Sequence, residues 1–153
     1  MSGAEVVALV QRLRADGKTI VFTNGVFDLL HPGHVRYLEH ARSLGDALIV
    51  GINSDRSVRS NKGLERPITP QGERIEIVEA LRSVDATVLF DEDTPDELIR
   101  MIQPDVLVKG ADWAEDAIVG REIVEARGGR VVRARIEPGY STTSIIGKIK
   151  ALR

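Results

Sequence analysis

The sequence contains no cysteine, no apolar run long enough to cross a membrane, and little excess of one charge. The absence of cysteine excludes disulfide bonds and thiolate metal ligands. A net charge of −2 with 29% charged residues argues against nucleic acid or an acidic lipid surface as a partner. Charged residues also interrupt segment 1–18, which therefore does not read as a secretory signal. Together these absences favour a cytoplasmic protein with no membrane partner.

Five short apolar segments alternate with helix-like segments along the 153 residues, a length that suits one domain spanning 1–153. The apolar segments are rich in β-branched residues, which is typical of buried strands. Strands that alternate with helices predict an α/β, Rossmann-like fold: a five-stranded parallel sheet with helices on both faces. In such a sheet, ligands bind beyond the carboxyl ends of the strands, where the strand order reverses. We expect strands at 19–23, 47–52, 87–90, 106–108 and 130–134.

Helices are expected where apolar residues recur every three or four positions and where capping residues mark a start. The Thr-Pro-Asp-Glu sequence at 94–97, for example, is typical of a helix N-terminus. The polar segment 56–68 contains glycine and proline, and it is predicted to be a mobile loop at the ligand edge. We expect helices at 4–15, 33–44, 94–103 and 117–126, and two more that start at 69 and 141.

Two histidines mark the junction between the first strand and the helix that follows it. His31 and His34 enclose Pro32 and Gly33, and proline suits a first helical position because its missing N–H would have no partner there. The imidazoles would then lie at the positive end of a helix dipole, where anions bind. The alternative is that both histidines only form the turn and cap the helix. A metal site is disfavoured because no third ligand stands at a suitable spacing.

A run of hydroxyl side chains at 141–144 follows the last predicted strand. Hydroxyls beside unpaired backbone N–H groups at a helix start can hold a phosphate, although an ordinary helix cap would have the same sequence. Polar residues also follow the first, second and fourth strands, at 24–34, 53–55 and 109–113. Because the carboxyl ends of parallel strands share one edge of the sheet, we expect these groups to meet there.

Segment 24–34, NGVFDLLHPGH, resembles the HxGH signature of the cytidylyltransferase-like nucleotidyltransferases. The run at 141–144 is similar to the second signature of that family, which holds the β- and γ-phosphates of the nucleotide. Within the family, the sequence looks closest to the heptose 1-phosphate adenylyltransferases, without the kinase half of the bifunctional members. The phrases that carry this likeness are INSD, ERPITP, DTPDELI, PDVLVKGADW and GYSTTSII.

The resemblance implies roles for particular residues. His31, His34 and Lys62 are the predicted catalytic residues, and Asp28 is a candidate contact for a Mg²⁺ ion that accompanies ATP. The predicted nucleotide-binding residues are Thr23, Asn24, Gly25, Phe27, Gly33, Lys109, Gly110, Ser141, Thr142, Thr143 and Ser144. The predicted substrate-binding residues are Asn24, Asp28, Asn53, Arg74, Asp112 and Trp113.

The implied reaction transfers AMP from ATP to D-glycero-D-manno-heptose 1-phosphate, giving ADP-heptose and pyrophosphate for a lipopolysaccharide-type glycan. Members of the family are commonly homodimers, so a homodimer is implied as well. ATP is expected over CTP because Ile136 stands where glycerol-phosphate cytidylyltransferases carry an arginine. Two alternatives remain: a cytidylyltransferase for a polyol or amino-alcohol phosphate, and a nucleotide-binding module without turnover.

Overall fold

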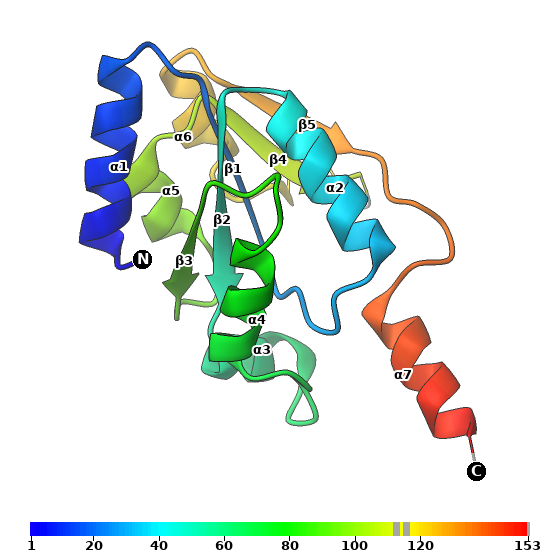
Figure 1. Ribbon diagram of the computed structural model, residues 1–153. Helices are drawn as coiled ribbons and strands as arrows, with labels where there is room; N and C mark the ends of the chain where they lie inside the picture. Colours follow the sequence, from blue (N-terminus) through cyan, green and yellow to red (C-terminus); the bar gives the residue numbers. More distant parts are fainter. Residues whose placement is uncertain (112–113, 115–116, 153) are drawn as a thin grey trace.

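The computed structural model describes residues 1–111, 114 and 117–152. At its centre is a five-stranded sheet in which every pair of neighbouring strands is parallel (Figure 1). The strand order β3-β2-β1-β4-β5 puts the first strand in the middle, so the strand order reverses between β1 and β4. The predicted α/β fold is therefore confirmed. The strands are β1 (Ile20–Gly25), β2 (Ala47–Asn53), β3 (Ala86–Phe90), β4 (Val106–Gly110) and β5 (Arg130–Ala134).

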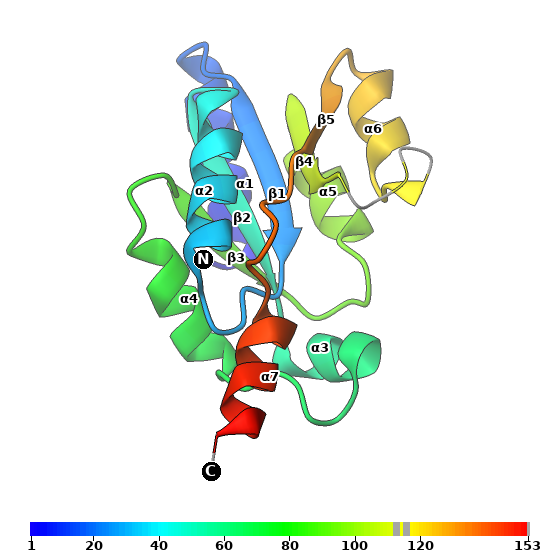
Figure 2. The same ribbon diagram turned by 90° about the vertical axis from the view of Figure 1, so that its right-hand side faces the viewer.

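Helices cover both faces of the sheet, as the two ribbon views show (Figures 1 and 2). One apolar cluster joins a face of the sheet to α1, α5 and α6 through side chains such as Val10, Ile99 and Val124. A second cluster joins the opposite face to α2 and α4 through Leu38 and Val78. These helices are α1 (Gly3–Ala15), α2 (Pro32–Ser43), α4 (Gln71–Glu79), α5 (Asp96–Ile102) and α6 (Arg121–Ala126).

Strand β2 shows why this sequence forms a covered sheet. All of its residues are buried. Successive side chains of a strand point to opposite faces, so Leu48 and Val50 join one apolar cluster while Ile49 joins the other. A strand that is apolar on both faces is stable only between two layers of helices. Because β1 and β2 are parallel and held between these layers, the polar loops that follow them extend from the same edge of the sheet.

The segment predicted to be a mobile loop at 56–68 contains a helix instead, α3 (Asp55–Lys62). Ser54 caps this helix, since its Oγ accepts the N–H of Ser57 over 3.1 Å. Ser57 and Val58 are buried while most of α3 is polar and exposed. The apolar pattern was therefore too sparse to reveal a helix, and only residues 63–70 form a connection without regular structure before α4.

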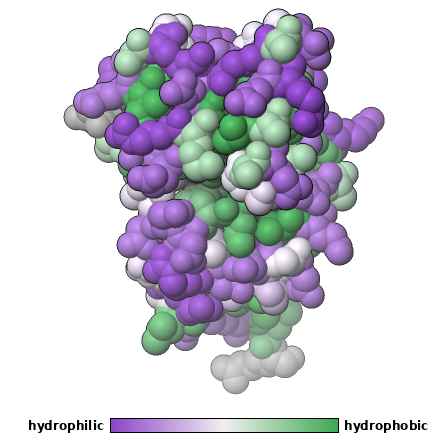
Figure 3. Space-filling view, turned by 90° about the vertical axis from the view of Figure 1, so that its left-hand side faces the viewer, coloured by the Kyte–Doolittle hydropathy of each residue, from purple (hydrophilic) through white to green (hydrophobic). Residues whose placement is uncertain are grey.

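The last helix, α7 (Thr142–Ala151), extends away from the body of the molecule in both ribbon views (Figures 1 and 2). None of its residues is buried. On the side of the molecule that carries α1, hydrophobic patches are separated by hydrophilic side chains (Figure 3). Among the described residues, no helix combines the length and the apolar character needed to cross a membrane.

Candidate active site

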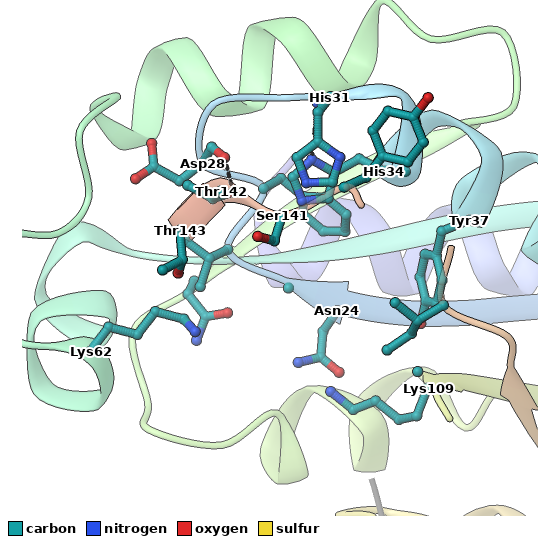
Figure 4. A pocket seen from close by; sticks show the side chains of 18 of the residues that line it. Asn24, Asp28, His31, His34, Tyr37, Lys62, Lys109, Ser141, Thr142 and Thr143 are labelled. Carbon is teal, nitrogen blue, oxygen red and sulfur yellow. Dashed lines mark hydrogen bonds between the residues drawn. The ribbon is translucent and has the colours of Figure 1, made fainter. Parts of the chain in front are cut away.

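A cavity of about 1230 Å³ opens at the carboxyl edge of the sheet, where the strand order reverses. Small-molecule sites usually measure about 300–1,000 Å³, so this cavity has room for two substrates. Side chains from the β1–α2 loop, α3, β4 and the start of α7 surround it (Figure 4). The predicted site residues that line it are Asn24, Gly25, Phe27, Asp28, His31, Gly33, His34, Asn53, Lys62, Lys109, Gly110, Ser141, Thr142 and Thr143.

The two histidines form a stacked pair at the start of α2. Their ring centroids are 3.8 Å apart and the ring planes differ by 22°. The backbone N–H of His31 donates to Nδ1 of His34 over 3.3 Å, which leaves the proton of a neutral His34 on Nε2. Nδ1 of His31 is buried and has no hydrogen-bond partner within the described residues. The pair thus combines a fixed donor with a ring atom that lacks a protein partner.

Burial keeps both imidazoles uncharged near neutral pH. Burial and the neighbouring His31 lower the pKa of His34 to about 4, although Asp28 acts in the opposite direction. Burial also lowers the pKa of His31. A neutral imidazole can still donate one hydrogen bond to a phosphate oxygen. The pair is therefore suited to donating hydrogen bonds rather than to supplying fixed positive charge.

Gly33 is required between the histidines by close packing. A Cβ atom at this position would lie 2.9 Å from the ring of His31 and 2.9 Å from Cβ of Tyr140. The ring of Tyr140 is nearly parallel to that of His31, with centroids 6.3 Å apart. Tyr140 directly precedes Ser141, the cap of α7, so this contact brings the second signature element against the first.

Asp28 anchors the loop between β1 and α2. Its carboxylate is buried and accepts the backbone N–H groups of Ile68, over 2.7 Å, and Thr69, over 2.9 Å. The residues on either side, Phe27 and Leu29, have φ angles of 53° and 50°, which side chains other than glycine rarely adopt. The carboxylate already has these two partners, and this favours an anchoring role over the predicted metal contact.

Arg74 does not reach the cavity, contrary to its predicted role as a substrate contact. Its side chain is fully buried on α4. Its guanidinium donates to the carbonyl oxygens of Val26, over 2.7 Å, and Thr69, over 2.9 Å. It also pairs with the carboxylate of Asp55 over 2.8 Å. Arg74 therefore joins the β1–α2 loop, α3 and α4, and its position corrects the prediction.

Two further predicted residues are absent from the cavity lining. Thr23 is buried, and its Oγ1 donates to the carbonyl of Val108 over 2.8 Å. Ser144 gives its backbone N–H to Oγ of Ser141 over 3.0 Å, as a helix cap does. These positions do not support the nucleotide contacts predicted for Thr23 and Ser144. The predicted substrate contacts Asp112 and Trp113 lie outside the described residues.

The start of α7 is tied to the β1–α2 loop and to the segment that precedes α4. Oγ1 of Thr142 donates to the carbonyl of Asp28 over 2.6 Å. Oγ1 of Thr143 accepts a hydrogen bond from the guanidinium of Arg66 over 3.0 Å. The predicted hydroxyl cradle is thus partly engaged in contacts within the protein, and the backbone N–H groups of Thr142 and Thr143 are the donors left for an anion, since that of Ser144 caps the helix.

Sequence reasoning assigned no function to several lining residues. Tyr140 could have been found, because it adjoins the hydroxyl run. No local pattern singles out the others, although two of them lie in the segment 56–68 that was expected at the ligand edge. They include Tyr37, Asn61, Arg66 and Asp93.

Fold and site together define a nucleotidyltransferase-type α/β domain. The model of the cytidylyltransferase-like family matches residues 22–148, and the chain belongs to that family. It is 54% identical over 145 residues to bifunctional protein HldE of Geotalea uraniireducens, covering 95% of this chain and 30% of that protein. It is also 54% identical over 140 residues to bifunctional protein HldE of Citrifermentans bemidjiense, covering 92% of this chain and 29% of that protein. The chain thus spans about 30% of the length of these curated relatives.

A solved structure is similar in both sequence and backbone. The crystal structure of the lipopolysaccharide core biosynthesis protein from Thermoplasma volcanium superposes with a TM-score of 0.65 at 30% sequence identity. The match covers 79% of this chain and 98% of that one. The backbone match therefore supports the α/β fold described above.

Proposed function

We propose that the chain is a nucleotidyltransferase that transfers AMP from ATP to heptose 1-phosphate, giving ADP-heptose and pyrophosphate. The observation that carries the proposal is a cavity in which two stacked, neutral imidazoles lie beside the start of α7. Membership of the cytidylyltransferase-like family supports nucleotidyl transfer. The solved relative named for lipopolysaccharide core biosynthesis supports a glycan precursor as the product.

The reaction moves the adenylyl group between two phosphate oxygens. A phosphate oxygen of the acceptor attacks the α-phosphorus, and the bond to the departing pyrophosphate breaks in line with the attack. Catalysis of such a transfer rests on positioning and on stabilising the charge that develops. Nε2–H of His34 donates to the triphosphate from a ring whose orientation the His31 backbone fixes. This donation strengthens as negative charge builds on the leaving oxygens.

The side of the cavity that faces the histidines suits the acceptor phosphate and its sugar. Oδ1 of Asn24 is buried without a hydrogen-bond partner among the described residues, so a ligand donor such as a sugar hydroxyl would satisfy it. The side chain of Lys109 extends toward Asn24 from the end of β4, and Lys62 extends from the end of α3 (Figure 4). We assign Lys109 to the acceptor phosphate and Lys62 to the triphosphate.

The described residues do not build a protein-held magnesium site. They contain no group of three or more histidine or acidic side chains that could hold a metal ion. The buried Asp28 carboxylate already accepts two backbone N–H groups. Mg²⁺ commonly binds through substrate phosphates and water with few protein ligands. We therefore expect Mg²⁺ to arrive with ATP.

Pyrophosphate release measured with four nucleoside triphosphates and a panel of acceptors tests the proposal. Heptose 1-phosphates should be adenylylated, and ATP should exceed CTP by at least about tenfold because a site shaped for one base leaves its polar groups unpaired by another. Faster turnover with CTP and a polyol phosphate would replace the proposal with the cytidylyltransferase alternative. ATP binding without turnover on any acceptor would favour the non-catalytic module.

We also propose that the chain forms a homodimer and acts in the cytoplasm. Ile149 and Leu152 are 57% and 76% exposed at the C-terminal end of α7. A ten-residue helix without buried residues is marginally stable alone, and packing against a second copy would cover these side chains. Light scattering on the purified chain and on Ile149→Glu tests the dimer. Fractionation of cells tests the location.

A further inference from the structure

The connection between α3 and α4 carries one arginine into the wall of the cavity. Arg66 has only 16% of its side chain exposed, although it lies in a segment without regular structure. One terminal nitrogen, Nη2, donates to Oγ1 of Thr143 over 3.0 Å, and Nη1 lies 3.9 Å from the Asp28 carboxylate. The guanidinium thus stands directly beside the start of α7.

Electrostatics make this position unfavourable for a cation unless an anion shares it. A helix N-terminus carries partial positive charge, which normally repels arginine and attracts carboxylates. The first turn of α7 contains no acidic residue. The Asp28 carboxylate offsets the charge only in part, because it is beyond hydrogen-bond distance of Arg66 and already accepts two backbone N–H groups. Among the contacts of Arg66 that the described residues show, only Asp28 brings negative charge, and the α7 start adds partial positive charge beside the guanidinium.

We propose that Arg66 contacts the β- and γ-phosphates of the bound nucleotide, together with the backbone N–H groups at the start of α7. This inference rests on the proposed function. Within the described part of the chain, one hydrogen bond engages this guanidinium. A guanidinium has five N–H donors and can bind two oxygens of one phosphate at once. Arg66 lines the cavity, whereas Arg74, a predicted substrate contact, is buried and engaged elsewhere.

Calorimetric titration with ATP, AMP and pyrophosphate tests this assignment in the full chain. In Arg66→Gln, we expect the dissociation constants for ATP and pyrophosphate to rise about 10- to 100-fold, the range of a charge-assisted hydrogen bond, while that for AMP changes less than about twofold. Arg66→Lys keeps the charge but loses the forked arrangement of donors. Its affinities for ATP and pyrophosphate should therefore lie between those of the wild-type chain and those of Arg66→Gln. Arg59→Gln is the matched control, because Arg59 is an exposed arginine of α3 outside the cavity lining.

The outcomes separate this inference from the proposed function. Equal weakening of ATP and AMP in Arg66→Gln, together with a lower melting temperature, would show that Arg66 only holds the connection in place and would overturn the inference. Wild-type affinity for ATP and pyrophosphate in Arg66→Gln would overturn it as well. In both cases, ATP binding by the wild-type chain would leave the proposed function standing. Failure of the wild-type chain to bind ATP or pyrophosphate would overturn both.

Discussion

The two signature elements that meet in the cavity are held in place in very different ways. The β1–α2 loop is fastened from inside the protein: Asp28 accepts two backbone N–H groups, and the buried Arg74 donates to the carbonyl of Val26. Helix α7 buries none of its residues and is tied near its N-terminus by the side chains of Thr142 and Thr143. One element is built into the core, and the other is attached to it.

This difference matches the work we propose for each element. Backbone strain of the kind seen at Phe27 and Leu29 costs about 1–3 kcal/mol per residue and persists only where surrounding contacts impose it. A loop fixed in this way holds the histidines in one geometry before substrate arrives, as catalysis by positioned donors requires. An attached helix can instead adjust to the phosphates and to their release. The comparison predicts that changes in the loop affect folding or rate, and changes at α7 affect binding.

The largest effect should come from removing Arg74, whose buried guanidinium holds the β1–α2 loop against α3 and α4. Arg74→Met leaves the Asp55 carboxylate and two carbonyl oxygens without their donor inside the protein, and breaking a buried ion pair usually costs about 3–5 kcal/mol. The free energy of unfolding, measured in urea, should fall by that amount. Arg100→Met is the control, because its pair with Asp96 is exposed and worth under about 1 kcal/mol. A stable Arg74→Met variant with weak substrate binding would restore the substrate contact that the sequence suggested.

Arg74 also shows where sequence reasoning reaches its limit. An arginine on a helix usually lies at the surface, and burial is tolerated here only because groups from Val26, Asp55 and Thr69 converge on it. Those partners come from separate segments of the chain, so no local sequence pattern predicts these contacts. The position of Arg66 in the cavity was not predicted for the same reason, because its contact with Thr143 joins two distant parts of the chain.

The parts that were predicted depend on local signals instead. The strands were located from runs of β-branched residues that no other element could bury. His31 and Gly33 stood out because a specific order of residue types forms the turn into α2. Helix α3 was missed because only Ser57 and Val58 are buried on it, too few to give a periodic pattern. Sequence therefore predicted the sheet and the edge where the cavity opens, but not the contacts that complete the cavity.

The next largest effect should appear in the rate. His34→Ala removes a positioned donor, which typically costs about 10²–10³ in kcat, or roughly 3–4 kcal/mol. The affinity for ATP should fall by less than about tenfold, because the α7 start and the base contribute separately. Single-turnover assays and calorimetric titration separate the two quantities. His34→Gln should recover part of the rate through its amide donor, and a destabilised His34→Ala variant with near-normal kcat would show that His34 only caps the helix.

A smaller effect should follow from pH. Since the pKa of His34 is about 4 in the folded chain and near 6.5 when unfolded, the unfolded chain binds the proton first on acidification. The free energy of unfolding should therefore be at full strength above pH 6.5 and should fall by up to about 1.4 kcal/mol per pH unit between pH 6.5 and 4. His34→Gln should flatten this slope in urea unfolding at a series of pH values. An unchanged slope would place the acid sensitivity elsewhere.

The smallest effect should come from loosening α7. Thr142→Val removes the hydroxyl that donates to the Asp28 carbonyl over 2.6 Å, while the helix keeps its Ser141 cap. A hydrogen bond of this kind contributes about 1 kcal/mol, so ATP affinity should fall about fivefold if α7 must be held against the loop to bind phosphate. The free energy of unfolding should change by no more than about 1 kcal/mol, because α7 buries no residue. Thr142→Ser keeps the hydroxyl and serves as the control in calorimetric titration. If Thr142→Val instead lost several kcal/mol of stability and kept its ATP affinity, α7 would belong to the rigid part of the protein, and the contrast between the two elements would be wrong.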